Sequence, residues 1–472
     1  MQHYISAEEL PEYHENLLVV KMLPSAQPQL AATRARGAGL EESSRGLYAL
    51  EYYERGGMIR RVTPVARQKR PVRGAMRGMA ALAASLPGAG REKPGLSSGV
   101  NIIEMQEGRH IEDLRMALAG DPNVEFVSKV ARRYVVVARK AAARSSAPSL
   151  SQMWNLKKIN WQAARSLPGF RDANGIKVAV LDTGIDIDHP DLKGQFSSYV
   201  FANPDLSRPT GENDIIGHGT HVAGTIAAKI NNSIGINGIC NCDLRIWKIF
   251  DDVADFLSMS AGYAYYVDPI MYFRALTDCI DQKVDVVNLS IGGGGAPDAF
   301  ESSLFAELIG GGTTVVAAMG NDRAYGSPTS YPAAIPGVIA VGATKINDKV
   351  AGFSNRGNHI SLCAPGAGIW STLPQYPGQF GFKAERGPNG WPREGKPIKR
   401  ETDYDSWDGT SMATPHVAAA AALLLANRGS MSPADVAAKL KSSSFRVKSM
   451  KKNSFHPDYG AGRLDLLKLL SS

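Results

Sequence analysis

Three short motifs place a carboxylate, an imidazole and a hydroxyl along the chain in that order. Asp182 follows an apolar run and precedes Thr-Gly, His218 lies in Gly-His-Gly-Thr-His, and Ser411 lies in Gly-Thr-Ser-Met-Ala-Thr-Pro. A serine hydroxyl is a poor nucleophile near neutral pH and needs an adjacent base. An imidazole can take its proton, and a carboxylate on the other ring nitrogen fixes the tautomer and stabilises the imidazolium. These residue types predict acyl transfer through Ser411.

Each of these residues also has an ordinary structural explanation. The Gly-Thr-Ser turn could simply cap a core helix, predicted to run to Leu425, whose dipole favours negative charge near its N-terminus. Asp182 could be a turn residue, and His218 or His221 could be a core histidine bonded to backbone. Because His221 lies within a predicted helix, we expect it to be the structural one of the two.

The elements that must position these residues are predicted from Trp154 onward, where apolar strands alternate with helices. Fully apolar strands in such an alternation predict an α/β fold with a parallel sheet covered on both faces. Ligands bind such sheets beyond the carboxyl ends of the strands, where Asp182, the turn at Gly292 and Asn321 are expected. The expected strands are residues 178–181, 244–249, 284–291, 313–319 and 338–343, and the expected helices are residues 222–230, 270–281 and 304–309.

The three motifs, in the order Asp, His, Ser, resemble the signatures of the subtilisin family of serine proteases, peptidase S8, whose chain order is well known. The resemblance runs from about Trp154 to the C-terminal segment, and Leu-Ser-Ile-Gly-Gly and Ala-Met-Gly-Asn stand in the matching places. It implies a subtilisin-like three-layer domain with a mostly parallel sheet. It also implies a serine endopeptidase that needs no nucleotide or organic cofactor.

The same resemblance assigns roles around the nucleophile. The Asn321 side chain would donate to the oxyanion, with the Ser411 backbone N–H as second donor. A peptide substrate would lie as an added strand along an exposed edge formed by Ser290, Ile291 and Gly292. The pocket for the side chain before the scissile bond would be bordered by Gly320 and Ser330, and Asp322 at its rim would favour a basic residue.

The resemblance further suggests a structural Ca²⁺ ion, although the chain carries one extra residue before the matching loop. Its oxygen ligands would be Asp191, the Asn232 side chain and the carbonyls of Ile230, Ile234 and Ile236, a set that suits a hard cation. A plain Asn-Gly-type turn is the alternative.

Residues 1–140 are expected to form a small α+β domain, followed by a linker and probable processing region, 141–152, and the catalytic domain, 153–472. Strands are predicted at residues 16–24, 46–53, 100–105 and 124–138, a helix at 111–118, and a basic insertion near 55–97. The second half of this unit resembles the family's inhibitory propeptide, which implies a latent zymogen that cleaves itself between Val136 and Leu150. An unrelated accessory domain is the alternative.

Charge and composition restrict the remaining classes. Hydrophobic residues make up 44% and charged residues 21% of the 472, and the chain holds no apolar run near the roughly 20 residues that cross a bilayer. Residues 51–100 hold ten Lys/Arg against three Glu, or +7 of the net +8. A solvated linker explains this segment better than nucleic-acid binding through residues 55–77, which stays the alternative.

The cysteines and one insertion leave further choices open. Cys240, Cys242, Cys279 and Cys363 are expected to be buried free thiols rather than a metal or redox site. With no signal peptide visible, they indicate a cytoplasmic protein. An extra loop, residues 375–404, would sit beside the cleft and either gate substrates, bind a partner or be inert. The alternative to an enzyme is a latent regulatory protein that uses the protease fold for partner contacts.

Overall fold

The computed structural model describes residues 10–23, 45–66, 96–135, 138–139, 152–201, 208, 210–257 and 262–471. These residues fold into two compact units, one of Glu15–Val130 and a larger one of Met1–His14 with Ala131–Ser472. Among the described helices, none is both long and apolar enough to cross a bilayer.

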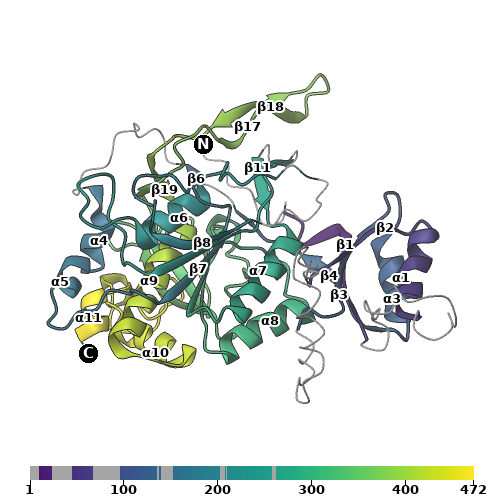
Figure 1. The fold of residues 1–472 in the computed structure, drawn as a ribbon. Coiled ribbons are helices and arrows are strands. Elements are labelled where there is room, and N and C mark those ends of the chain that lie inside the picture. The colour runs from purple at the N-terminus through teal and green to yellow at the C-terminus, as the bar shows by residue number, and fades with distance from the viewer. Residues whose placement is uncertain are drawn as a thin grey trace, which may run out of the picture. The chain divides into compact units, whose positions relative to one another are not determined.

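The larger unit is built around a sheet of seven parallel strands in the order β15-β14-β13-β12-β7-β9-β8 (Figure 1). Its five central strands are buried at nearly every position, as their continuous apolar sequences predict. The strands are β7 (Lys177–Asp182), β8 (Phe196–Val200), β9 (Asp243–Lys248), β12 (Val286–Leu289), β13 (Thr314–Ala318), β14 (Ile339–Thr344) and β15 (Ile360–Pro365).

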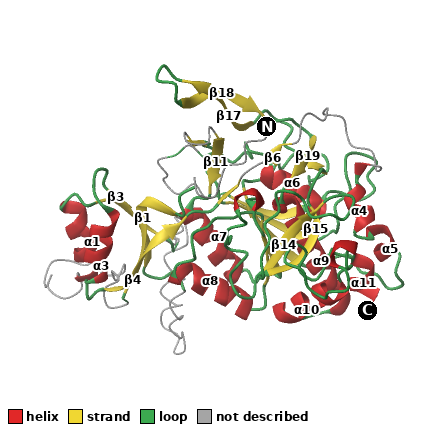
Figure 2. Cartoon of the chain, turned by 180° about the vertical axis from the view of Figure 1, so that it is seen from behind, coloured by secondary structure: helices red, strands yellow, loops and turns green. Residues whose placement is uncertain are grey.

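Helices cover both faces of this sheet, which confirms the predicted three-layer α/β fold (Figure 2). α6 and α9 contact each other, and α9 packs along β7, β12, β13, β14 and β15 of this sheet. α7 and α8 contact each other, and they pack on β7 and β13. The helices are α4 (Trp154–Lys158), α5 (Trp161–Arg165), α6 (His218–Ala227), α7 (Pro269–Asp281), α8 (Ala299–Gly310), α9 (Thr410–Arg428), α10 (Pro433–Ser443) and α11 (Leu466–Ser471).

Two helices begin earlier than the apolar runs that predicted them. α8 begins at Ala299 and not at residue 304, since the Asp298 carboxylate accepts from the N–H groups of Phe300 and Glu301. α6 begins at His218 and not at residue 222, after Gly217 adopts the left-handed conformation. Both corrections move a polar side chain into a first helical turn.

Smaller antiparallel sheets surround the central one. One has the order β10-β11-β5 and the other β16-β19-β6, while β17 and β18 form a hairpin. The strands are β5 (Tyr134–Val135), β6 (Ala138–Arg139), β10 (Asp255–Leu257), β11 (Gly262–Tyr266), β16 (Ile369–Thr372), β17 (Gln379–Arg386), β18 (Pro392–Lys399) and β19 (Tyr404–Asp408).

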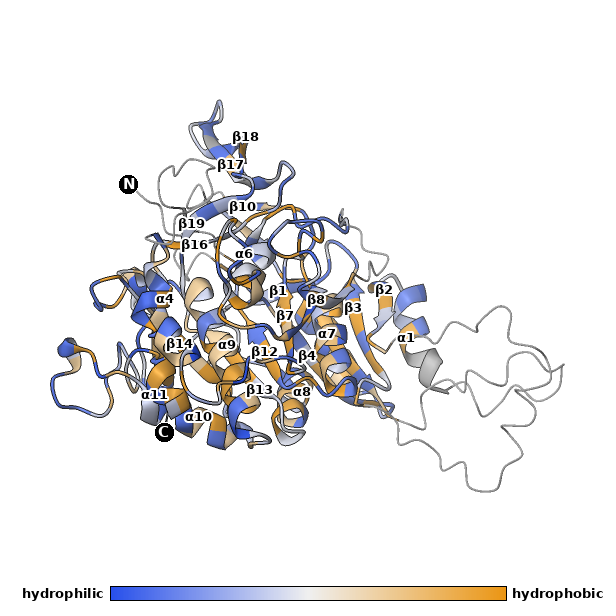
Figure 3. Ribbon diagram, turned by 60° about the vertical axis from the view of Figure 1, so that its left-hand side comes forward, coloured by the Kyte–Doolittle hydropathy of each residue, from blue (hydrophilic) through white to orange (hydrophobic). Residues whose placement is uncertain are grey.

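Two expectations are corrected by these sheets. Residues 375–404 were predicted as a loop, but they contain the β17–β18 hairpin, which is mostly hydrophilic while the strands of the central sheet are mostly hydrophobic (Figure 3). The sequence of this hairpin lacks the alternation of apolar and polar residues that predicts a strand. Residues 124–138 were predicted as one strand, but the chain leaves β4 (Val124–Ala131) and resumes pairing in β5 with β11.

The smaller unit is a four-stranded antiparallel sheet, β2-β3-β1-β4, with α1 (Arg45–Arg55) and α3 (Ile111–Ala119). β1 spans Tyr13–Met22, β2 Ile59–Pro64 and β3 Val100–Met105. Its core is formed by Leu18, Val20, Met22, Leu50, Ile59, Ile103, Met105, Leu114 and Leu118.

Residues 46–53 were expected to be a strand and form helix α1 instead. Leu50 and Tyr53, three positions apart, both pack into the core, which is the spacing of one helix face and not of a strand. The first part of the basic insertion is strand β2, where Arg60 contacts Glu104 at 3.2 Å. Residues 67–95 of that insertion, and most of the 141–152 linker, lie outside the described residues.

Candidate active site

The carboxyl end of β7 and the first turn of α6 bring Asp182 and His218 together. The His218 Nδ1 lies 2.7 Å from Asp182 Oδ1, and both side chains are buried. A Cβ on Gly219 would come within 2.1 Å of the Gly184 carbonyl oxygen, so only glycine lets α6 approach the turn after β7 this closely. Small residues in both motifs therefore position the pair.

The Asp182 contact fixes the protonation of the imidazole. A carboxylate can only accept, so His218 Nδ1 carries a proton, and in the neutral ring Nε2 then presents its lone pair. Nε2 is buried and has no hydrogen-bond partner among the residues that the structure describes. An acceptor left open in this way is what a general base requires.

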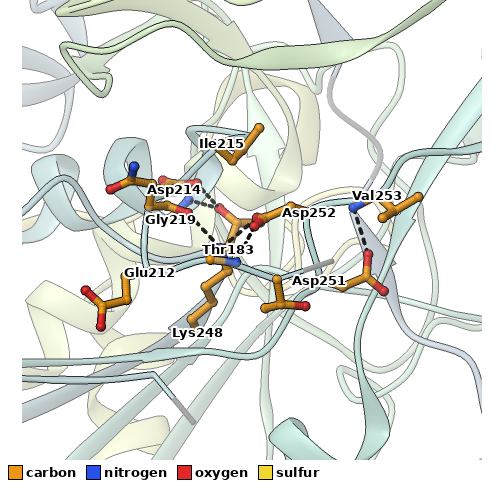
Figure 4. A network of polar contacts seen from close by, with 12 residues as sticks. Thr183, Glu212, Asp214, Ile215, Gly219, Lys248, Asp251, Asp252 and Val253 are labelled. Atoms are coloured by element: carbon orange, nitrogen blue, oxygen red, sulfur yellow. Dashed lines mark hydrogen bonds and ion pairs between the residues drawn. The ribbon is translucent and has the colours of Figure 1, made fainter. Parts of the chain in front are cut away.

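A second carboxylate, which the sequence reasoning missed, holds this turn and helix in register (Figure 4). Asp214 Oδ1 accepts from the Thr183 hydroxyl and the Gly217 N–H, both at 2.8 Å. Its Oδ2 accepts from the N–H and hydroxyl of Thr220. Asp214 thus ties the residue after Asp182 to the helix that carries His218. Its only signal in the sequence was its place four residues before His218.

Ser411 lies in the first turn of α9, beside the carboxyl ends of β12 and β13. Its Oγ donates to the Ser290 carbonyl at 3.0 Å, and the Ser290 hydroxyl donates to the Ser411 carbonyl at 2.9 Å. Among the hydrogen bonds of the described residues, none joins Ser411 to His218. Such bonds are often long before substrate binds.

Asn321 follows β13 and is oriented by the residue before the serine. Its Oδ1 accepts from the N–H and the hydroxyl of Thr410, at 2.9 and 3.0 Å. With the oxygen held there, the amide nitrogen of Asn321 is the group left to donate elsewhere.

The predicted substrate residues line one pocket with Ser411. Its lining includes Tyr134, Val135, Ser290, Ile291, Gly292, Ala318, Gly320, Asn321, Asp322, Ser330, Thr410 and Ser411. A Cβ on Gly292 would meet the Ser330 hydroxyl at 2.7 Å, so glycine keeps this part of the wall open. Burial raises the pKa of Asp322 to about 6, which keeps part of its population neutral at mildly acidic pH.

The edge predicted to be exposed for substrate is paired with the chain's own residues. The Tyr134 N–H donates to the Gly292 carbonyl at 2.8 Å, and the Gly292 N–H donates back at 3.2 Å. On its other side Tyr134 pairs with Tyr266 of β11. Further along, Ala138 pairs with Asp408, three residues before Ser411. Tyr134 and Ala138 thus pair with backbone on two sides of Ser411.

A model of the subtilase family (peptidase S8) matches residues 173–462, which include all three motifs. The chain belongs to the subtilase family.

Two curated relatives agree with this membership. Subtilisin amylosacchariticus from Bacillus subtilis subsp. amylosacchariticus is 32% identical over 355 residues, covering 74% of this chain and 76% of that protein. The major intracellular serine protease of Bacillus subtilis (strain 168) is 37% identical over 255 residues, covering 53% and 68%.

A solved structure shares the fold. Fervidolysin from Fervidobacterium pennivorans, described as a keratinolytic enzyme related to subtilisin, aligns with a TM-score of 0.63 and 23% identity over 98% of this chain. This subtilase spans 61% of the length of that structure. At this identity the likeness shows the fold alone.

The second histidine of the motif has structural partners in this subtilase. The His221 ring stacks on Trp407 with centroids 4.9 Å apart, and its Nε2 lies 3.0 Å from the Ile369 carbonyl oxygen. Burial lowers the pKa of His221 to about 3, so its ring stays neutral. His221 is therefore placed to pack beside His218 and not to exchange protons.

Of the predicted calcium ligands, Asp191, Asn232 and Ile236 are in contact with one another through hydrogen bonds to the Asp191 carboxylate. The buried Asp191 carboxylate contacts the Asn232 amide and accepts from the Ile236 N–H and the Tyr404 hydroxyl, both at 3.0 Å. Ile230 and Ile234 flank Asn232 in the same loop. One carboxylate, one amide and loop carbonyls are oxygen donors that fit Ca²⁺. In the described part of the chain, no three His, Cys, Asp or Glu side chains cluster as a metal site.

The cysteines are unpaired, and Cys240, Cys279 and Cys363 are buried. A hydrogen bond with Cys242, together with burial, raises the pKa of Cys240. A protonated thiol is a poor metal ligand and a poor nucleophile.

Proposed function

We propose that this subtilase is a serine endopeptidase whose triad is Asp182, His218 and Ser411. The observation that carries the proposal is the buried Asp182–His218 contact, which leaves His218 Nε2 open as a base. Ser411 and Asn321 line the same pocket, so the nucleophile and the oxyanion donor would face the same peptide carbonyl of a bound substrate.

The reaction follows from these positions. Ser411 Oγ attacks the peptide carbonyl carbon while its proton passes to His218 Nε2. The carbonyl oxygen becomes an oxyanion, stabilised by the Asn321 side-chain N–H and the Ser411 backbone N–H. As the C–N bond breaks, His218 returns the proton to the leaving amine. Water then attacks the acyl-enzyme, with His218 again as the base.

We propose that substrates lie antiparallel to Ser290, Ile291 and Gly292. The support is that Tyr134 already pairs with Gly292 in the way a substrate strand would. Gly320 and Ser330 would then border the side chain before the scissile bond, with Asp322 beside it.

We further propose that the chain is a latent precursor, with residues 1–140 as its inhibitory propeptide, 141–152 as the processing region and 153–472 as the catalytic domain. The pairing of residues 134–135 and 138–139 within the larger unit supports this, because a substrate cannot use the same backbone groups at the same time. A regulatory role through partner contacts is the alternative, and an open base on a buried imidazole argues against it.

Calcium and location complete the proposal. Asp191, Asn232 and the carbonyls of Ile230, Ile234 and Ile236 would hold Ca²⁺, whose charge would fasten the loop to the Asp191 carboxylate. Thermal melts with added calcium and with chelator test this. The unpaired thiols support a cytoplasmic location.

The experiment is intact mass and N-terminal sequencing of purified full-length chain under denaturing conditions. Wild type is expected to yield two pieces separated between Val136 and Leu150, while Ser411→Ala stays whole. Ser442→Ala, at an exposed serine on the helix α10, should process like wild type. If wild type remains a single whole chain, as Ser411→Ala is expected to, self-processing is wrong.

A further inference from the structure

Arg133 occupies a buried acidic pocket one residue before the pairing with Gly292. Its side chain is 1% exposed, and that of Glu301 is 2% exposed. The guanidinium donates Nη2 to Glu301 Oε2 at 2.7 Å and Nε to Glu301 Oε1 at 3.2 Å. Its Nη1 donates to the Gly295 carbonyl at 2.8 Å. This bidentate arrangement fits a planar guanidinium, and an ammonium group cannot reproduce it.

The pocket belongs to the folded scaffold and not to the segment that fills it. Glu301 lies in the first turn of α8, where the helix dipole favours a negative charge. The Asp298 side chain accepts the Glu301 N–H, and the Tyr272 hydroxyl donates to Glu301 Oε1 at 3.1 Å. The carboxylate is thus held in place by groups on α7 and α8, while its cation comes from another segment.

The pairing of the segment that carries Arg133 shows which position of a bound peptide would enter the Glu301 pocket. Tyr134 pairs antiparallel with Gly292. In a substrate strand that repeats this register, the residue two positions later lies opposite Ser290, whose carbonyl contacts the Ser411 hydroxyl. The bond after that residue is the one Ser411 would attack. The position of Arg133 is therefore the fourth residue before the scissile bond.

We propose that Glu301 is a specificity-determining residue that selects arginine at the fourth position before the scissile bond of peptide substrates. The proposal rests on the endopeptidase function given above. Arg133 then has two roles. It occupies the pocket as the arginine of a preferred substrate would, and it anchors the segment that pairs with Gly292.

The energetic reason is that a bound peptide covers this carboxylate whichever side chain it presents, as the segment of Arg133 does in the structure, where the Glu301 side chain is 2% exposed. A buried charge that loses its partner pays the full cost of desolvation, so a substrate with leucine at this position leaves Glu301 uncompensated. Lysine restores the charge but only one of the two parallel hydrogen bonds. The expected order of substrates is arginine, then lysine, then leucine.

The experiment compares internally quenched peptides in which only one residue changes. The parent carries the chain's own sequence Ala-Arg-Arg-Tyr-Val-Val-Val-Ala-Arg, residues 131–139. Variants replace the second arginine with lysine or leucine, and a control replaces the first arginine with leucine. Each is assayed for kcat/KM with purified wild type, Glu301→Gln, and Glu307→Gln, which alters an exposed glutamate on the same helix.

With wild type, the parent peptide is expected to exceed the leucine variant by about 30-fold or more in kcat/KM. Glu301→Gln should reduce this ratio to a few-fold, while Glu307→Gln leaves it unchanged. The control peptide should lose much less. Equal rates for the arginine and leucine peptides with wild type would overturn the proposal, and this comparison does not depend on the variant folding.

Failure of the proposed function gives a different result. If wild type cleaves none of the peptides above the rate of Ser411→Ala, the endopeptidase proposal fails. If the peptides are cleaved but the arginine preference is the same in wild type and in a folded Glu301→Gln, only the role of Glu301 fails. Mass spectrometry of the products checks that the cut follows the fourth residue counted from the arginine.

Discussion

The Asp182–His218 pair and the Arg133 pocket are both buried contacts between a carboxylate and a nitrogen-bearing side chain, but the two side chains differ in how many of their nitrogens are bonded. His218 gives one nitrogen to Asp182, and its other nitrogen is without a partner among the described residues. Arg133 spreads its donors over Glu301 and the Gly295 carbonyl. An open nitrogen on a titratable ring can move a proton, whereas a guanidinium, which keeps its charge, can only recognise and anchor.

The largest expected effect is the loss of activity in Asp182→Asn, which should leave the peptide preference set by Glu301 unchanged. Asp182→Asn cannot fix the His218 tautomer, so kcat/KM should fall by about 10⁴-fold, as found for this change in a serine-protease triad. The ratio between arginine and leucine peptides should not change, because Glu301 is untouched. Steady-state kinetics with both peptides measure this, and Asp281→Asn at an exposed aspartate is the control. A loss below tenfold would contradict the role of Asp182.

The proposed oxyanion donor, Asn321, gives the second-largest expected effect. Asn321→Ala should lower kcat by about 10² to 10³-fold, a range known for such a donor in this family, with little change in KM. The reason is that the developing charge exists only in the transition state. If KM rises while kcat is unchanged, Asn321 binds the ground state and the assignment is wrong.

Arg133 tests the anchoring side of the comparison. In a Ser411→Ala background, which removes the proposed nucleophile, Arg133→Leu should free the segment around residues 131–139. Thermolysin should then cut there about tenfold faster or more, since breaking one side of a buried ion pair costs several kcal/mol.

The matched control for that variant is its neighbour. Arg132 lies over the Tyr266 ring at 4.8 Å and is partly exposed, so Arg132→Leu should change the cutting rate much less. Equal rates for the two variants would show that Arg133 does not anchor the segment.

The smallest effect concerns a buried ring that neither contact uses. Burial lowers the pKa of His416 to about 4, against an ordinary value of 6.5. The unfolded chain therefore binds more protons between these values, and stability present above pH 6.5 is lost as the pH falls toward 4. The slope for this group is at most about 1.4 kcal/mol per pH unit. Urea unfolding at pH 7 and 5.5 should show less loss in His416→Asn than in wild type.

The same contrast explains what the sequence could predict. Asp182, His218 and Ser411 sit in short motifs of small residues at strand and helix ends, so local pattern and family resemblance located them. The parallel sheet followed from continuous apolar strands. The pocket of Arg133 and Glu301 joins residues 168 positions apart, and no local pattern links them.

The remaining errors share a physical cause. Helix α1 was taken for a strand because its aromatic residues have strand propensity, while packing of Leu50 and Tyr53 selects the helix. The hairpin of β17 and β18 has little apolar alternation to read. Asp214 acts through four backbone and hydroxyl donors, which a sequence does not display.

The most direct test of the central claim is covalent labelling of the serine with a fluorophosphonate, followed by peptide mapping. Only a hydroxyl activated by a neighbouring base reacts, so wild type should carry the adduct on Ser411. Ser411→Ala should carry none, and His218→Ala should react far more slowly. Glu301→Gln should label on Ser411 as wild type does. A processed wild-type chain that remains unlabelled, or an adduct on another serine, would contradict the account.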